Sequence, residues 1–293
     1  MKLKNQQVYH LIVYIYFMRQ TITQLLQHAN KDIDIYEAEI LLSHVLKKTK
    51  EYIISNPKIK VNLFVSYKYK KLIKKRSKGI PIAYLTGHKE FFGLNFFINK
   101  YTLIPRPDTE ILVESVLNYI TNKNILIDIG TGSGCIPISI LKNKKVTTAY
   151  ATDISKKALK IANKNAHSHN VKITFLQGSL LEPLIDIIKN IDDIYITANL
   201  PYLTEEQFKT EKSIQYEPKS ALVAKNNGLD LYEKLLHQIK TFSNKTITAF
   251  FEIDPSQSKN ITNLIKKIFT KSKIEIKKDL SNYDRVIIIK IVN

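Results

Sequence analysis

The chain has 293 residues, enough for one large domain or two smaller ones, and 44% of them are apolar, which is ample for a core. Its single cysteine, Cys135, excludes an internal disulfide and a cysteine-based zinc cluster, and the scattered histidines predict no metal site. The net charge of +19 favours acidic partners such as RNA, a ribosome or an acidic protein, although the Lys-, Ile- and Asn-rich composition of an AT-rich gene explains it equally well.

The chain begins with an almost unbroken apolar run over residues 9–17. This run is too short to span a bilayer, which needs about 20 residues. No small-residue cleavage site follows it, as a signal peptide would require. We interpret residues 1–17 as an extension before the first domain, with Met18 as an alternative start, and we expect no stable membrane association. A helix that touches a surface or a membrane is the other interpretation.

Residues 18–80 have the pattern of a small helical domain. Apolar side chains recur at helical spacing over residues 22–29 and again over residues 38–45. Asp32 and Asp34 precede the second helix and are suited to cap it. Residues 68–78 form a basic helix face, which is typical of a solvated surface rather than a binding site.

A β-hairpin is predicted after the helical domain. Residues 84–97 carry strand-forming side chains interrupted by Gly87 and Gly93. We assign residues 81–104 to this connecting hairpin segment. Two prolines in the segment that follows forbid a helix before Asp108 or Thr109, and either residue can cap a helix over residues 111–116.

Strand-like and helix-like segments alternate from residue 125 onward. The expected strands cover residues 125–129, 147–153, 173–176, 194–198, 246–253, 273–276 and 286–291, and the expected helices cover 156–169, 232–239 and 261–268. Such alternation predicts a doubly wound α/β fold with a largely parallel sheet. We place this domain at residues 105–293.

A glycine loop follows the first of these strands and opens a helix. It consists of Gly130, Thr131, Gly132, Ser133 and Gly134. Glycines at these positions let the backbone turn tightly and approach a nucleotide-like ligand without a Cβ clash. The third glycine comes one residue earlier than in the dinucleotide fingerprint, and a plain strand-to-helix turn is the alternative. Asp128 precedes the loop and is expected near the charged amino-acid end of the ligand.

Asp153 ends the second strand of the sheet, at the edge where the glycine loop lies. An acidic side chain there can accept hydrogen bonds from both hydroxyl groups of a ribose. A helix N-cap is the alternative role for this residue. The combination of the loop and the acid favours a nucleoside-containing cofactor, and S-adenosylmethionine is the one that fits best with the motif described next.

The segment Asn199-Leu200-Pro201-Tyr202 ends the fourth strand at the same sheet edge. An amide nitrogen is a poor nucleophile because its lone pair is delocalised into the carbonyl. The Asn199 side-chain oxygen and the Leu200 carbonyl are suited to accept both N–H hydrogens of an acceptor amide, while Pro201 stiffens the turn and the Tyr202 ring packs on the flat acceptor. The pattern predicts methyl transfer to an amide or amino nitrogen; an ordinary strand-to-loop turn is the alternative.

These motifs belong to a larger set of segments that together match the sequence pattern of one enzyme family. The set includes residues 81–87, 90–91, 93–94 and 103–110, the glycine loop with Cys135 and Ile136, residues 216–218 with 221–222, residues 228–232, and residues 284–286. With this set, the chain from about residue 18 to residue 293 resembles the N5-glutamine methyltransferases of the HemK/PrmC family, which methylate peptide-chain release factors.

The resemblance implies a cytoplasmic monomer with an N-terminal helical bundle that docks the release factor. It also implies a Rossmann-like class I methyltransferase sheet of seven strands whose last strand is antiparallel. The acceptor is then the glutamine of the Gly-Gly-Gln loop of peptide-chain release factors 1 and 2, held by residues 199–202. The glycine loop, Asp153, the region of Ser179 and Leu180, and Asn199 are implied to hold S-adenosyl-L-methionine.

The chain departs from the family pattern at three positions. Leu200 replaces the first proline of the usual Asn-Pro-Pro-Tyr, and leucine can substitute there, with a looser turn, if the residue serves through its carbonyl. Ser179 stands where an acidic residue is common beside the adenine, which predicts weaker cofactor binding. Phe92 replaces a usual tryptophan, which we interpret as a packing change.

Three other functions share part of this pattern. A methyltransferase acting on a glutamine of a ribosomal protein has the same catalytic motif and differs in the N-terminal domain and hairpin. An adenine-N6 methyltransferase of DNA or RNA uses a similar motif on a flipped base, and the positive charge fits it. That class is opposed by the signature over residues 81–110 and by the lack of an evident target-recognition domain. A cofactor-binding protein without turnover is the third.

Overall fold

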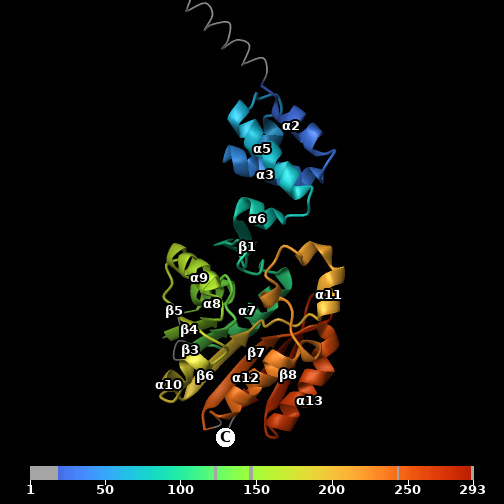
Figure 1. The fold of residues 1–293 in the computed structure, drawn as a ribbon. Helices are drawn as coiled ribbons and strands as arrows, with labels where there is room; N and C mark the ends of the chain where they lie inside the picture. The colour runs from blue at the N-terminus through green and yellow to red at the C-terminus, as the bar shows by residue number, and fades with distance from the viewer. Residues whose placement is uncertain (1–18, 122–123, 145–147, 243, 292–293) are drawn as a thin grey trace, which may run out of the picture. The chain divides into compact units, whose positions relative to one another are not determined.

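The computed structural model describes residues 19–121, 124–144, 148–242 and 244–291, and it divides into two compact units after Thr86 (Figure 1). The extension predicted over residues 1–17 lies outside the described residues. Within the described part, no helix has the length and apolar character needed to cross a membrane.

The first unit is a bundle of helices around its own core, as its sequence pattern predicts. The helices are α2 (Ile22–Ala29), α3 (Ile35–Leu46), α4 (Lys50–Ser55), α5 (Leu63–Arg76) and α6 (Ile82–Thr86). Leu25, Leu41 and Tyr69 are buried at its centre. Asp34 caps α3 by accepting a hydrogen bond from the backbone N–H of Tyr36 at 2.8 Å, which confirms one of the two predicted caps.

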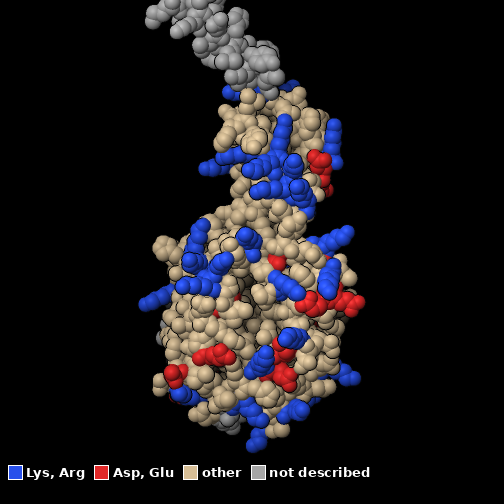
Figure 2. Space-filling view, in the orientation of Figure 1, with Lys and Arg blue, Asp and Glu red and all other residues tan. Residues whose placement is uncertain are grey.

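Basic side chains dominate the visible surface of this first unit. Figure 2 shows many Lys and Arg side chains there and few acidic ones. Within this unit, Glu37 binds Arg76 through two hydrogen bonds of 2.7 Å. A bidentate pair of this kind ties α3 to the end of α5.

The second unit begins with the predicted hairpin, but the hairpin is shorter than expected. Its strands are β1 (His88–Phe91) and β2 (Leu94–Phe97), paired antiparallel around a turn at Phe92 and Gly93 with positive φ. Residues 84–86, which the sequence pattern places in the hairpin, belong to helix α6 instead. β-Branched and aromatic side chains there occupy a single helical turn, which short apolar stretches do not distinguish from a strand.

The helix after the two prolines also differs from its prediction. A 3-10 turn, η1 (Pro107–Thr109), leads directly into α7 (Glu110–Leu117), so helical geometry begins at a proline in the first turn, where proline is tolerated. Neither Asp108 nor Thr109 caps this helix with its side chain, contrary to expectation. Both side chains make contacts elsewhere, as described for the site below.

The core of the second unit is a seven-stranded sheet with the strand order β5-β4-β3-β6-β7-β9-β8. The strands are β3 (Ile125–Ile129), β4 (Thr148–Asp153), β5 (Thr174–Gln177), β6 (Asp193–Ala198), β7 (Thr246–Glu252), β8 (Lys273–Lys278) and β9 (Asp284–Ile291). Strand β9 runs antiparallel to both of its neighbours and the strands β3 to β7 pair in parallel. The predicted fold, with its antiparallel last strand, is therefore confirmed.

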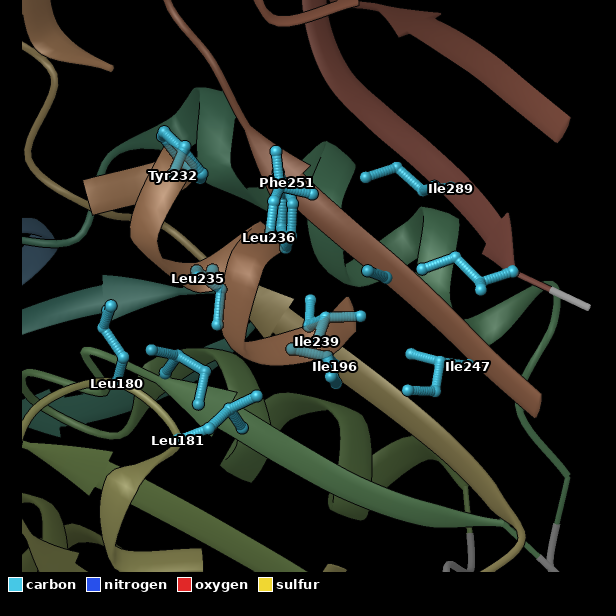
Figure 3. Close-up of a cluster of buried hydrophobic side chains, with 14 of the residues drawn as sticks. Leu180, Leu181, Ile196, Tyr232, Leu235, Leu236, Ile239, Ile247, Phe251 and Ile289 are labelled. Carbon is cyan, nitrogen blue, oxygen red and sulfur yellow. The ribbon is translucent and has the colours of Figure 1, made fainter. Parts of the chain in front are cut away.

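Helices cover both faces of this sheet. They are α7, α8 (Cys135–Asn143), α9 (Lys156–Ser168), α10 (Ile185–Ile188), α11 (Glu205–Thr210), α12 (Asp230–Lys240) and α13 (Ser258–Ile268), with 3-10 turns at Glu182–Leu184, Lys212–Ile214, Lys219–Ala221, Asn226–Gly228 and Pro255–Gln257. Leu235, Leu236 and Ile239 of α12 pack with Ile196 and Phe251 of the sheet (Figure 3). Helix α8 contacts both α7 and α9, and these helices contact the strands β3, β4 and β7.

The sheet order brings three strand ends together. Strands β4, β3 and β6 are neighbours and parallel, so their carboxyl ends meet at one edge. The glycine loop follows β3, Asp153 ends β4, and Asn199 follows β6. A switch point of this kind is where open α/β sheets bind ligands.

Candidate active site

The glycine loop is held in place by its own backbone geometry and by Asp153. Gly130, Gly132 and Gly134 have φ values of 69°, 56° and 80°, a region that other residues rarely adopt. The Asp153 carboxylate accepts hydrogen bonds from the backbone N–H of Gly132 at 2.9 Å and of Ser155 at 2.8 Å. Burial raises the pKa of Asp153, while these two N–H groups oppose that rise. Asp153 therefore fixes the loop as well as bordering the space beside it.

A cavity of about 260 Å³ lies beside this loop. Eight of the predicted site residues line it, namely Gly130, Gly132, Asp153, Ser179, Leu180, Asn199, Leu200 and Pro201. Sequence patterns missed other lining residues, among them Tyr101, Ile154 and Ala158. The side of Gly132 that would carry a Cβ meets only the Gly130 carbonyl, at 3.9 Å, so the loop presents bare backbone to the space around it.

Four predicted residues, one before the loop and three within it, are buried and do not line this cavity. Asp128 is fully buried, accepts a hydrogen bond from Thr197 Oγ1 at 2.6 Å, and has its pKa raised by burial to about 7. Thr131 and Ser133 are also buried. A Cβ at Gly134 would lie 3.0 Å from the Ile138 side chain and 3.2 Å from the Ala162 Cβ. This glycine therefore allows α8 and α9 to pack closely. Cys135 is buried behind the loop as well, and burial raises the pKa of its thiol to about 12.

A second cavity, of about 380 Å³, lies on the other side of the motif over residues 199–202. All four residues of the motif line it, together with Arg106, Glu252 and Ile214. Asn199, Leu200 and Pro201 line both cavities, so the two spaces meet at the motif. A donor group in one cavity and an acceptor group in the other would therefore both border these three residues.

Hydrogen bonds from two distant segments hold the motif in place. The Leu200 N–H donates to the Tyr232 hydroxyl at 3.1 Å, and that hydroxyl donates in turn to the backbone carbonyl of Glu252. The Tyr202 carbonyl accepts from Gln257 Nε2 at 3.2 Å. Tyr232 and Gln257 are fully or nearly fully buried, so the turn after β6 is rigid on its inner side.

Asn199 is oriented by contacts that the sequence did not reveal. Its Nδ2 donates to Thr109 Oγ1 at 3.2 Å. Glu252, at the end of β7, is 1% exposed and lies near the side chains of Asn199 and Thr109. Burial raises the pKa of its carboxyl to about 7. One signal for Glu252 was available, because a single acid that ends the apolar run of residues 246–253 falls at the functional edge of the sheet.

Other segments of the family pattern stabilise the part of the chain that lies next to the site. Glu217, which is 5% exposed, accepts a hydrogen bond from the Ile104 N–H at 2.9 Å and pairs with Arg106. Arg285 binds Asp108 at 3.2 Å. The segment over residues 103–110 is therefore anchored at two points next to the motif.

Comparisons with known proteins agree with this architecture. The model of the PrmC N-terminal domain matches residues 18–87, and that of a methyltransferase domain matches residues 111–229. Among the described residues, no group of three His, Cys, Asp or Glu is arranged to hold a metal. The solved hMettl16 catalytic domain, in complex with MAT2A 3'UTR hairpin 1, is similar with a TM-score of 0.53 over 85% of this chain and 90% of that one. At 16% identity this likeness concerns the fold alone.

Two curated relatives match over most of their length. The release factor glutamine methyltransferase of Bacillus anthracis is 32% identical over 85% of this chain and 90% of its own. The protein of the same name from Mycoplasma mycoides is 33% identical over 93% of this chain and 99% of its own. The chain therefore belongs to the family of release factor glutamine methyltransferases.

Proposed function

We propose that this protein transfers a methyl group from S-adenosylmethionine to the side-chain amide nitrogen of the glutamine in the Gly-Gly-Gln motif of peptide-chain release factors, and so acts in translation termination. The observation that carries the proposal is the meeting of two cavities at Asn199, Leu200 and Pro201. Membership of the family and the match of residues 18–87 to the PrmC N-terminal domain support the release factor as substrate.

The cavity beside the glycine loop fits the cofactor. Gly130 and Gly132 allow close backbone approach, and Asp153 offers carboxylate oxygens that a ribose can use as hydrogen-bond acceptors. Ser179 and Leu180 border the same space. When bound, S-adenosylmethionine supplies an electrophilic methyl group: the amide nitrogen forms the N–C bond, the electrons of the broken S–C bond remain on sulfur as S-adenosylhomocysteine forms, and one amide proton passes to solvent.

The cavity on the other side fits a planar amide. Because Asn199 Nδ2 is engaged with Thr109, Asn199 Oδ1 is the end left to accept an N–H of the substrate. The Leu200 carbonyl is suited to accept the second N–H. Holding both hydrogens in the plane of the amide directs the nitrogen's electrons toward the methyl group. Positioning and electrostatics then supply the rate, without a covalent intermediate.

The first experiment is mass spectrometry of the Gly-Gly-Gln peptide of an unmodified release factor after incubation with the protein and S-adenosylmethionine. We expect a single added methyl on the glutamine. Asn199→Ala is the control, because it removes an acceptor for the reacting amide: it should abolish transfer and keep cofactor affinity within about threefold. Full activity of that variant would contradict the role of Asn199. Methylation only of a ribosomal protein or of adenine in RNA, tested in parallel, would overturn the proposed substrate.

A further inference from the structure

The acceptor cavity contains a buried carboxyl group that the proposed reaction does not yet use. Glu252 ends strand β7, is 1% exposed and lines the cavity together with Asn199 and Tyr202. Its Oε2 has no hydrogen-bond partner among the described residues. A buried acid that is only partly satisfied is costly to the fold, so a function in the site explains its presence better than a structural role does.

Groups from several elements face this carboxyl. The side chains of Thr109 on η1 and of Asn199 after β6 lie close enough to this carboxyl to lower its pKa. The charge of Arg285 on β9 lowers the pKa of Glu252, and the charge of Asp108 raises it. The charge of Glu252 in turn raises the pKa of the hydroxyl groups of Tyr202 and Tyr232. Thr109 and Asn199 also contact each other, since Asn199 Nδ2 donates to Thr109 Oγ1 at 3.2 Å. Glu252, Thr109 and Asn199 therefore form one connected group.

We propose that ionised Glu252 is a positioning residue that, with Thr109, takes up both hydrogens of Asn199 Nδ2 and so keeps Asn199 Oδ1 turned toward the acceptor amide. This inference rests on the proposed function. It explains why an asparagine, whose two ends have nearly the same shape, would be held in a single orientation at the point where the two cavities meet.

The chemistry of the three groups favours this arrangement. An ionised carboxylate only accepts hydrogen bonds, so it binds the NH2 end of Asn199 and rejects the oxygen end. Accepting hydrogen bonds from the two Nδ2 hydrogens also polarises the Asn199 amide and makes its Oδ1 a stronger hydrogen-bond acceptor. Protonated Glu252 becomes a donor, which can bind Oδ1 and compete with the substrate for it.

The arrangement predicts a pH dependence of turnover. Burial is the main cause that raises the pKa of Glu252, and Asp108 adds to it; Thr109, Arg285 and Asn199 oppose the rise, and the result is about 7. Because the ionised form is the active one, kcat should fall as the pH decreases through this region. Asp128 has a pKa of about 7 for the same reason but lies before the glycine loop and does not line the acceptor cavity. It serves as the matched control.

The test compares pH profiles of kcat for the full chain and three variants, with an intact unmodified release factor as substrate. In Glu252→Gln we expect kcat to fall by about tenfold or more and the acid limb near pH 7 to disappear, while the KM for S-adenosylmethionine stays within about twofold. Asp128→Asn should keep the acid limb. Thr109→Val, which removes only the hydroxyl, should lower kcat without moving that KM, and it provides the test if Glu252→Gln does not fold.

The outcomes separate this inference from the function on which it rests. If the unaltered protein methylates no release factor, the proposed function fails and the role of Glu252 with it. If the unaltered protein is active while Glu252→Gln keeps both its kcat and its acid limb, only the role of Glu252 is overturned. Loss of the acid limb in Asp128→Asn would also overturn it, because the titration would then belong to the residue before the glycine loop.

Discussion

Asp153 illustrates how a single side chain can serve both the fold and the ligand. Its carboxylate accepts N–H groups from Gly132 and Ser155, so it closes the loop against the strand end, and it also lines the cofactor cavity. Of the two roles that the sequence leaves open for Asp153, the helix N-cap is wrong, and ribose binding stays a prediction. The true N-cap of α9 is Ser155, whose side chain accepts the Ala158 N–H.

The variant Asp153→Ala tests whether this carboxylate binds the ribose of the cofactor. Removing the carboxylate deletes an acceptor for the ribose and frees the Gly132 N–H, so S-adenosylmethionine affinity should fall by about tenfold or more, as expected for hydrogen bonds to a charged group. Isothermal titration calorimetry measures the effect. Asp153→Asn keeps the shape of the side chain with one acceptor oxygen. Its affinity for S-adenosylmethionine should lie between those of the unaltered protein and Asp153→Ala. An unchanged affinity in Asp153→Ala would rule out the ribose assignment.

Leu200→Pro tests the departure from the usual Asn-Pro-Pro-Tyr. If the carbonyl of residue 200 is what matters, as in the sequence-based hypothesis, Leu200→Pro should be neutral for turnover or improve it. The structure predicts a loss of folding stability as well, because the Leu200 N–H donates to the Tyr232 hydroxyl and proline has no N–H. We expect unfolding in urea to show a loss of about 0.5–1.5 kcal/mol, with kcat kept within about threefold.

A double-mutant cycle gives this prediction its control. Tyr232→Phe removes the same hydrogen bond from the other side, so Leu200→Pro should cost little more in that background. A full additional loss of stability in the double variant would show that the cost comes from backbone strain instead of the missing N–H. A collapse of kcat in Leu200→Pro would show that the leucine side chain itself is needed.

At the scale of elements, the site depends on a 3-10 turn that packs against the catalytic motif. Gly228 ends the turn Asn226–Gly228 with a φ of 84°. A Cβ at this position would lie 2.0 Å from the Tyr202 carbonyl oxygen and 2.2 Å from Gln257 Nε2. The turn, the motif and the start of α13 are therefore packed without room for one more carbon.

Gly228→Ala should displace the Tyr202 carbonyl, because neither the backbone nor the buried Gln257 can yield. We expect a loss of stability of more than about 2 kcal/mol and a kcat reduced at least about tenfold. The matched control is Gly93→Ala in the hairpin turn, where φ is 68° and nothing lies within 4 Å of the added carbon. That variant should lose about 1–2 kcal/mol from the backbone alone and retain kcat. Equal effects of the two substitutions would contradict the packing argument.

At the scale of the whole molecule, the chain consists of two units that each have a core. Leu41, Leu42 and Ile53 are buried within the first, and Ile196, Phe251 and Ile289 within the second. Both cavities of the site are lined entirely by residues of the second unit. We therefore expect the chemistry to belong to the second unit and the helical unit to serve in recognition of the substrate.

A fragment of residues 87–293 tests this division. Because the cofactor cavity lies within it, we expect its affinity for S-adenosylmethionine to stay within about threefold of the full chain. With an intact release factor, its kcat/KM should fall by about a hundredfold, as expected when a second contact is lost. With a short Gly-Gly-Gln peptide, the fragment and the full chain should be equally slow. Equal activity on the intact protein would remove the docking role from residues 18–80.

The sequence alone determined the fold class, the sheet and the parts of the site that follow its strands. Periodicity placed the strands of the large sheet to within about two residues, because alternating and buried strands have a strong local pattern. The glycine loop, Asp153 and Asn199 were predicted to meet because parallel strands place their carboxyl ends at one edge. Local pattern was insufficient for residues 84–86 and for the start of helical structure at Pro107, where short segments take the conformation that their packing imposes.

Only the tertiary structure decided which side chains complete the site. Thr109 and Asn199 are 90 residues apart, and Ile104 and Glu217 are 113 apart, yet each pair is joined by a hydrogen bond. Contacts of this range depend on how separate segments pack, which no local pattern encodes. The same packing buried Asp128 and Ser133 and brought Glu252 and Asn199 to the lining of one cavity. The sequence therefore predicts where the chemistry occurs, and the packing of distant segments determines which atoms lie there.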